Sequence, residues 1–394
     1  MSLQILVVAM HYLENFQSNF AHIVGCKKAF AFWKGRVAMY AILKACGVKG
    51  GDEVILPGYT CVMDVNPIKY LGAKPVYVDI EPNTFNMNSA LLESKITPKT
   101  KIIVAQHTYG YPCDMDAIMA ITTKRGIVVI EDCCLSFGSM YKGKTVGTFG
   151  KAAYFSFQWN KPFTTGLGGM ALTNDADLAE KIWRLCDSDM CMPSAKEVMM
   201  LAAQLAVYRM FIYPRTTALA QNIFRYLTKK GAVVGSSSSC EFEPEMEKDF
   251  FKAMSSVQAV AGMRQLKKLE KNIEHRREMA ELYDELLLQK GWPTRNYDKE
   301  VMNPVMVRYP VRIKEKDKAI QQAASAGIEL GTWFECPLHP IETPLEKYDY
   351  QIGMCPEAEK ASREVVNLPL HPRATKKTVR RTVEFIAGFT PVID

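Results

Sequence analysis

The sequence predicts an α/β fold, in which a buried, mostly parallel sheet forms a large domain and a smaller domain follows it. Between residues 50 and 175, short runs rich in Val and Ile alternate with helical stretches. This alternation is typical of parallel strands joined by crossover helices. The chain has 394 residues, which is long enough for two packed units.

Six apolar runs are the expected strands of the sheet. They are Glu53–Leu56, Pro75–Val78, Ile102–Ala105, Ile127–Ile130, Ala153–Phe157 and Gly169–Leu172. Because each run is apolar throughout, helices should cover both faces of the sheet. Ligands should then bind at the carboxyl ends of the strands.

The smaller domain is expected in the last third of the chain. A charged stretch from Met254 to Leu287 repeats apolar residues every three or four positions and predicts one long helix. A strand near Val305–Val311 and a last helix near Lys376–Ile386 should follow. We therefore predict a large domain over 1–245, which includes an N-terminal arm, and a small domain over 246–394.

The large domain should carry an apolar helical insert at about 190–245. Its core, VMMLAAQLAVYRMFIYP, is interrupted by polar residues and Pro214 before it could span a membrane. One interpretation is a helical pair packed on the body of the protein or in a dimer interface. The other is peripheral membrane or lipid contact through 196–230, because Arg and Lys residues flank the apolar stretch.

Composition narrows the class of protein. With 48% hydrophobic and 23% charged residues, the chain has a globular balance. Its formal net charge of +7 is spread along the chain, so nucleic-acid binding is not indicated. The eleven cysteines form no CxxC pair and the N-terminus lacks a secretory signal, so we expect a reduced, cytoplasmic location and no metal.

Two charged residues stand where chemistry is expected. Asp132 ends the apolar run GIVVIEDCC, and its neighbour Glu131 should point to the opposite face. Lys161 lies between an apolar strand and a Gly-rich turn in FSFQWNKPFTTGLGG. Partial burial would favour its neutral amine, the form that adds to a carbonyl as a Schiff base. A turn-capping aspartate and a solvated turn lysine are the alternatives.

A phosphate site is expected where Gly35 and Arg36 open a helix that runs to about Cys46. Helix N-termini present free N–H groups and the positive end of the helix dipole to anions. Ser156, at the end of another strand, offers a hydroxyl group. The segment lacks the GK[ST] ending of a Walker loop, and a plain helix start is the alternative.

Several motifs occur together in a recognisable order. After Gly35-Arg36 come GDEVILPGYT, GAKPVYVDIEPNTFNM, AQHTYGYPCDM, VVIEDCCLSFGSMYKGKTVGTFG, SFQWNK and TGLGGMALTND, and then SVQAVAGMRQLKKL and PEAEKASREVVNLPLHP. This order resembles the DegT/DnrJ/StrS family of sugar aminotransferases. The resemblance covers nearly the whole chain except about residues 190–245.

The resemblance implies a homodimeric fold-type I enzyme that uses pyridoxal 5'-phosphate. Such enzymes have a large αβα domain with a mostly parallel sheet and a smaller α+β C-terminal domain. Lys161 matches the Schiff-base lysine and Asp132 the partner of the pyridine nitrogen. Ser156 and the Gly35-Arg36 helix start match the phosphate ligands.

Other matched positions lie beside the cofactor or the substrate. Thr60 matches a position beside the cofactor, and Leu135 stands at a cofactor position where Gln or His is usual. His339, Gln158 and Tyr109 are the candidate substrate residues. Further departures from the family are Cys61, Leu167, Phe251 and Ala253, which together predict a more apolar pocket than usual.

The implied reaction is transamination of a keto-sugar, with an amino acid such as glutamate as donor, in surface-glycan or secondary-metabolite sugar biosynthesis. A nucleotide-linked sugar is the first expectation and a lipid-linked sugar the second. A dehydration on the same cofactor is one rival, although dehydratases of this family replace the lysine by histidine, and Lys161 argues against it. The other rival is a non-catalytic scaffold or regulator.

Overall fold

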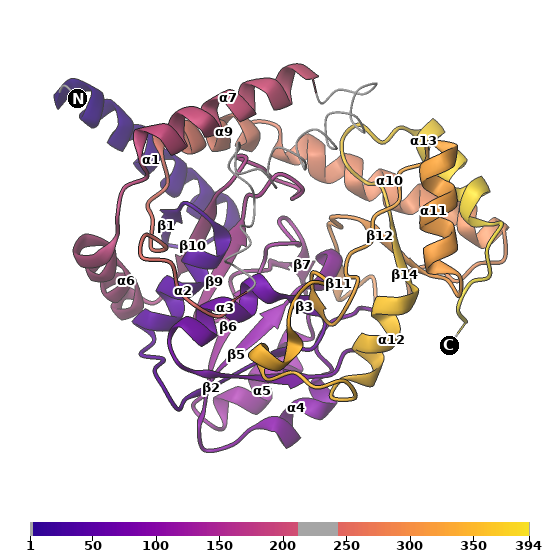
Figure 1. Cartoon of the computed structure of the whole chain (residues 1–394), viewed down its shortest axis with the longest axis horizontal. Helices are drawn as coiled ribbons and strands as arrows, with labels where there is room; N and C mark the ends of the chain where they lie inside the picture. The colour runs from indigo at the N-terminus through magenta and orange to yellow at the C-terminus, as the bar shows by residue number, and fades with distance from the viewer. Residues whose placement is uncertain (1–2, 212–242, 394) are drawn as a thin grey trace.

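A seven-stranded sheet forms the centre of the large domain, and its strand order is β1-β10-β9-β6-β5-β2-β4. The computed structural model describes residues 3–211 and 243–393, and Figure 1 shows the arrangement. In the order of the sheet, the strands are Lys28–Phe32, Gly169–Thr173, Ala152–Ser156, Val128–Asp132, Thr100–Gln106, Glu53–Pro57 and Lys74–Val78. Neighbours from β9 to β4 pair in parallel, whereas β10 is antiparallel to both of its neighbours. The predicted mostly parallel α/β fold is confirmed.

All six predicted strands are present, with boundaries shifted by no more than two residues. The seventh strand, β1, was not predicted, because its sequence KAFAF lacks the run of Val and Ile that marks the others. It pairs with β10 at the edge of the sheet, where Phe32 lies opposite Gly169.

The sheet is covered on both faces, as its apolar strands predict. Successive residues of one strand point to opposite faces, so Val54 belongs to the core cluster that includes helix α2, whereas Ile55 belongs to the cluster that includes helices α4 and α5. Helix α1 covers β9 and β10 through Phe16 and Phe20, which pack with Phe155. The helices of this domain are α1 Leu3–Val24, α2 Gly35–Ala45, α3 Val62–Tyr70, α4 Ser89–Lys95, α5 Met115–Thr123, α6 Ala176–Asp189 and α7 Ala195–Phe211.

The long helix expected over 254–287 is two helices, so that prediction was wrong. Helix α9 spans Ser256–Leu266 and α10 spans Leu269–Gln289. Apolar periodicity continues through the break, but the two helices pack on different partners. Helix α9 packs against α1, whereas α10 packs against α13, Lys376–Ile386, in the last part of the chain.

The small domain gathers to the right in Figure 1, around β12 (Tyr309–Arg312) and β14 (Val365–Leu368). The predicted last helix has the bounds of α13, whereas the predicted strand near Val305–Val311 begins later. Its first residues bond elsewhere, since the Val305 N–H donates to the Ser139 hydroxyl group. Helices α11 (Lys316–Ala326) and α12 (Pro356–Glu364) complete this domain. The division at 245/246 stays a prediction.

Helix α7 packs on the body of the protein. Its Leu201 and Leu205 are buried in one cluster with Trp33, Leu167 and Ala261. The second helix of the predicted pair lies outside the described residues. Within residues 3–211 and 243–393, no helix is long and apolar enough to cross a membrane.

Candidate active site

The site lies at the carboxyl edge of the parallel strands. Asp132 ends β6 and is 3% exposed. The Cys134 N–H donates to its Oδ1 at 2.8 Å, and the His107 N–H donates to its carbonyl oxygen at 3.1 Å. These bonds fix the carboxylate at the position where ligands of open parallel sheets bind.

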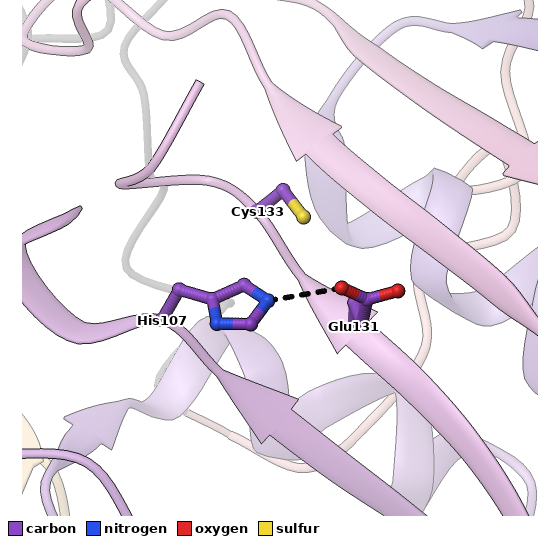
Figure 2. Close-up of side chains that lie close together, drawn as sticks. All are labelled: His107, Glu131 and Cys133. Carbon is purple, nitrogen blue, oxygen red and sulfur yellow. Dashed lines mark hydrogen bonds and ion pairs between the residues drawn. The ribbon is translucent and has the colours of Figure 1, made fainter. Parts of the chain in front are cut away.

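Glu131 points away from Asp132, as the alternation of a strand predicts. Its carboxylate accepts the N–H groups of Gly147, Phe149 and Gly150, each at 2.7 Å. Its Oε2 also lies 3.2 Å from His107 Nε2, and both side chains are fully buried (Figure 2). Glu131 is therefore a structural residue that holds the loop before β9.

His107, Glu131 and Cys133 together have the composition of a metal site, because their ligand atoms lie within 4.8 Å of one another (Figure 2). However, His107 Nδ1 accepts the Cys113 N–H at 2.9 Å, so Nε2 carries the proton and donates to Glu131. Both ring nitrogens and the carboxylate are thus occupied by hydrogen bonds. This group braces the ends of β5 and β6 and offers no open set of metal ligands.

A second acid, Asp64, lies beside Asp132. It is in the first turn of α3, and the Tyr154 hydroxyl group donates to its Oδ1 at 3.1 Å. Burial, and then the charge of Asp132, raises the pKa of Asp64 to about 7, while Lys161 and Arg36 act in the opposite direction. Sequence reasoning missed Asp64, although it is the one acid in the helix VMDVNPIKY.

The raised pKa of Asp64 predicts a pH-dependent stability. Between pH 4 and 7 the unfolded chain loses the proton, whereas the folded chain keeps it, so this group makes the fold less stable as the pH rises. Asp64→Asn should therefore stabilise the cofactor-free protein at pH 8 relative to pH 5, by on the order of 1–3 kcal/mol. Urea unfolding of both proteins at both pH values measures the difference. An equal effect at pH 5 and pH 8 would contradict the assignment.

Lys161 lies on the loop between β9 and β10 and is half-buried. Its Nζ lies 5.2 Å from the centre of the Trp333 ring. The loop is fixed directly after the lysine. Phe163 packs parallel to Phe16 of α1, and the carbonyl oxygen of Pro162 accepts from Asn272 Nδ2 of α10 at 2.7 Å. Lys161 and Asp132 thus share a neighbour, Asp64, whose pKa both of them influence.

The helix start at Gly35 lies directly against Ser156, as the phosphate prediction requires. A Cβ atom on Gly35 would lie 2.6 Å from the Ser156 Cβ, and one on Gly169 would lie 2.4 Å from the Lys34 carbonyl oxygen. Helix α2 has no side-chain cap at its N-terminus. Glycine at 35 and 169 therefore lets the helix start and the strand ends come into direct contact, so that backbone N–H groups and a hydroxyl group lie side by side, and the residues present fit a phosphate.

Gly35→Ala should disrupt this phosphate site. The added methyl group would meet Ser156 at its Cβ and also, at 3.0 Å, at its Cα, so the helix start and β9 must separate. We expect at least about 10-fold weaker cofactor binding and a loss of about 1–3 kcal/mol of stability. Fluorescence titration with pyridoxal phosphate measures the first effect. Gly50→Ala is the control, since its Cβ would meet only one atom, at 3.8 Å.

The substrate side of the site contains His339. It lies on β13 (Leu338–His339), which pairs in parallel with β3 (Thr60–Cys61), so that His339 is the register partner of Cys61. Burial lowers the pKa of His339 to about 4 against the opposing effect of Glu335, and the imidazole is therefore neutral at pH 7. Thr60 is buried beside it and donates its hydroxyl proton to Gln106.

Tyr109, a predicted substrate residue, and Leu135, predicted at a cofactor position, are both buried. Tyr109 is fully buried, and its hydroxyl group bonds to the Tyr59 hydroxyl group at 3.0 Å and to the Trp333 carbonyl oxygen. It therefore supports the Trp333 segment, and its hydroxyl group is engaged within the protein. Leu135 is buried in the main core cluster, whereas Gln158 is half-buried on the Lys161 loop.

The departures from the family pattern lie in apolar clusters. Leu167 packs with Leu201 and Leu205 of α7, so the inserted helix covers the Gly-rich turn beside Lys161. Phe251 packs against Phe32, and Ala253 forms a backbone bridge with the same residue. The described chain thus uses these positions for packing.

Comparison with known proteins identifies the family. The model of the DegT/DnrJ/EryC1/StrS aminotransferase family matches residues 5–210 and 214–387. A GDP-perosamine synthase of Caulobacter vibrioides is 32% identical over 94% of this chain and 88% of its own length. Another, from Escherichia coli O157:H7, is 46% identical over 43% of this chain and 47% of its own length.

A solved structure shows the same fold. A chain from Streptococcus pneumoniae, determined in its PLP-form, superposes with a TM-score of 0.74 at 22% identity and covers 96% of this chain and 90% of its own length. The predicted fold type, enzyme class and cofactor class are confirmed by these matches. The chain belongs to the DegT/DnrJ/EryC1/StrS aminotransferase family of pyridoxal-phosphate enzymes.

Proposed function

We propose that this chain transfers an amino group from an amino acid to a nucleotide-linked keto-sugar, with Lys161 as the reacting amine. The observation that carries the proposal is the convergence of one lysine and two acids near the start of α2. The charges of Asp132, Lys161 and Arg36 all influence the pKa of Asp64. Gly35 touches Ser156 on the phosphate side of the same site.

Each of these residues would hold one part of pyridoxal phosphate. The N-terminus of α2 and Ser156 would bind the phosphate, Lys161 would bond to the aldehyde carbon, and Asp132 would face the ring nitrogen. When bound, the cofactor supplies an electron sink for the bonds that break at the amino-bearing carbon.

The protein itself holds charge and moves protons. The carboxylate of Asp132, fixed by the Cys134 N–H, would keep a proton on the ring nitrogen. Lys161 Nζ, once displaced by the incoming amino group, would take the proton from the α-carbon of the donor. Phe157 and Phe163 pack behind its loop and keep this face of the loop away from water.

The relatives favour the substrate class. Both curated relatives named above are GDP-perosamine synthases, which supports a GDP-linked keto-sugar as acceptor and a role in surface-glycan biosynthesis. A neutral His339 near Lys161 could accept a hydrogen bond from a sugar hydroxyl group. Glutamate is the proposed donor and the cytoplasm the proposed location.

A half-reaction screen tests the proposal. Purified protein with added cofactor should show the near-visible band of the lysine-bound form, glutamate should remove that band, and one keto-sugar nucleotide should restore it. A protein that takes up no cofactor would contradict the proposal and leave the scaffold interpretation. A near-visible band that no amino acid alters would favour a dehydratase or a non-catalytic member.

We also propose a homodimer. A second possibility for helix α7 is contact with a membrane surface through its outward face. Met199 and Val207 of this helix are 66% and 49% exposed. Light scattering at two protein concentrations tests the dimer. Liposome flotation of the wild type and of Met199→Glu tests the membrane surface and, with it, a lipid-linked acceptor. Equal flotation of the two proteins would exclude contact through this face.

A further inference from the structure

Helix α7 contacts two parts of the candidate site that are distant in the sequence. Its Leu201 shares one buried cluster with Trp33 and Leu167. Trp33 comes two residues before Gly35, where the phosphate side of the site begins, and Leu167 lies in the Gly-rich turn that ends the Lys161 loop. The helix also packs against α9 (Figure 1). One helix therefore touches both the phosphate side and the lysine side of the site.

The loop that carries Lys161 is closed at its base by hydrogen bonds. The Thr165 N–H and the Thr164 hydroxyl group both donate to the Phe157 carbonyl oxygen, each at 3.0 Å. Within the loop, the Lys161 N–H donates to the Gln158 carbonyl oxygen at 3.0 Å. These bonds make the loop a compact unit, so a contact at its base affects the position of the lysine.

Side chains of α7 contact both arms of this loop. On the first arm, the Trp159 ring packs on the Tyr208 ring, with their centres 5.0 Å apart. On the second arm, Gly166 has a φ of +85°, and a Cβ atom there would lie 3.0 Å from Leu201 Cδ1 and 3.0 Å from the Trp159 ring. Glycine thus lets this arm approach α7 closely. Trp159, two residues before Lys161, lies between the helix and the second arm.

A group of charged side chains anchors the start of α7. Lys252 is 7% exposed, and its Nζ lies 2.6 Å from Glu197 Oε1, in the first turn of α7, and 2.6 Å from Asp249 Oδ2. The backbone of the same lysine is also engaged, since its carbonyl oxygen accepts the Trp33 N–H at 3.0 Å. The start of α7 is therefore tied to the segment that leads to Gly35.

We propose that α7 is a positioning element for the reaction, and that its Tyr208 and Leu201 hold the Lys161 loop in place relative to the phosphate site. This inference rests on the proposed function, because it takes Lys161 as the reacting amine. An amine and an aldehyde react only when they are held close together, and a displacement of about 1 Å can lower a rate about 100-fold. The apolar insert thus acts on the reaction through the loop that it covers.

Two forms of the cofactor test the proposal, because only one of them bonds to Lys161. Pyridoxal phosphate forms that bond, whereas pyridoxamine phosphate has the same ring and phosphate but no aldehyde. Trp159→Ala should weaken the binding of pyridoxal phosphate about 10-fold and change that of pyridoxamine phosphate less than about 2-fold. Trp159→Phe keeps a ring against Tyr208 and should recover most of the affinity. Calorimetry measures the binding, and thermal unfolding midpoints show that each variant is folded.

A double-mutant comparison tests whether α7 acts through this contact. Tyr208→Ala should also weaken the binding of pyridoxal phosphate. The double variant should bind it no more weakly than the more affected single variant, because both changes remove the same contact. Val207→Ala is the control, since this residue of α7 is 49% exposed and its replacement should leave both affinities unchanged.

Equal weakening of both cofactor forms would show general damage to the site and overturn the positioning role. Additive effects of the two substitutions, or wild-type affinity for pyridoxal phosphate in Trp159→Ala, would overturn it as well. These failures differ from failure of the proposed function, in which the wild type itself would show no near-visible band.

Discussion

Replacing Lys161 by alanine is expected to reduce transamination at least about 10⁴-fold, the largest effect of any substitution considered. The side chain would supply both the bond to the cofactor and the base that moves the proton. Among the residues that influence the pKa of Asp64 most strongly, Lys161 is the one lysine. The variant should also lack the near-visible band of the lysine-bound cofactor. Steady-state rates and absorbance spectra measure the two effects.

Lys161→Arg separates charge from reactivity. Arginine keeps a positive charge that can lie over the Trp333 ring, but it cannot become a neutral amine near pH 7. It should therefore be nearly as inactive as the alanine variant, while both variants keep the thermal unfolding midpoint of the wild type. Activity within about 10-fold of the wild type in either variant would refute the role of this amine.

Asp132→Asn should have the second largest effect, a loss of about 10²–10³-fold in kcat. The amide can still accept the Cys134 N–H, now 2.8 Å from Oδ1, so the end of β6 should stay in place. What it loses is the negative charge that would hold a proton on the ring nitrogen. Single-turnover rates with glutamate measure this step directly.

Asp64→Asn is the matched control for that variant. It removes a neighbouring carboxylate that is bonded to Tyr154 and Thr60 and whose raised pKa of about 7 leaves it only partly ionised at neutral pH. Its activity should fall less than that of Asp132→Asn. If the order of the two effects is reversed, then Asp64 and not Asp132 serves the ring nitrogen.

The sheet could be predicted because its strands obey a simple physical rule. Strands buried on both faces must be apolar throughout, and runs such as VVIED and KIIVAQ keep to this composition. The break between α9 and α10 could not be predicted, since the apolar period continues through Lys267 and Lys268. What divides the two helices is the surface on which each packs, which is a property of the tertiary structure.

The candidate site was predictable only where one residue stands out in its own segment. Lys161 and Asp132 stand out because each follows an apolar strand. Gly35 and Ser156 were both predicted to bind the phosphate, and their direct contact agrees with that shared role. Asp64 was missed because its importance comes from Asp132, which is distant in sequence. Trp333 was missed for the same reason, since it is unremarkable in its own segment and meets Lys161 only in the folded chain.

The most direct test of the central claim is to find the residue that carries the cofactor. Borohydride reduction of the cofactor-loaded protein fixes the lysine bond permanently, and peptide mass spectrometry then locates the added pyridoxyl phosphate. We predict that the label lies on the peptide that contains Lys161 and is absent from the Lys161→Ala protein. A label on another lysine, or a wild-type protein that acquires none, would contradict it.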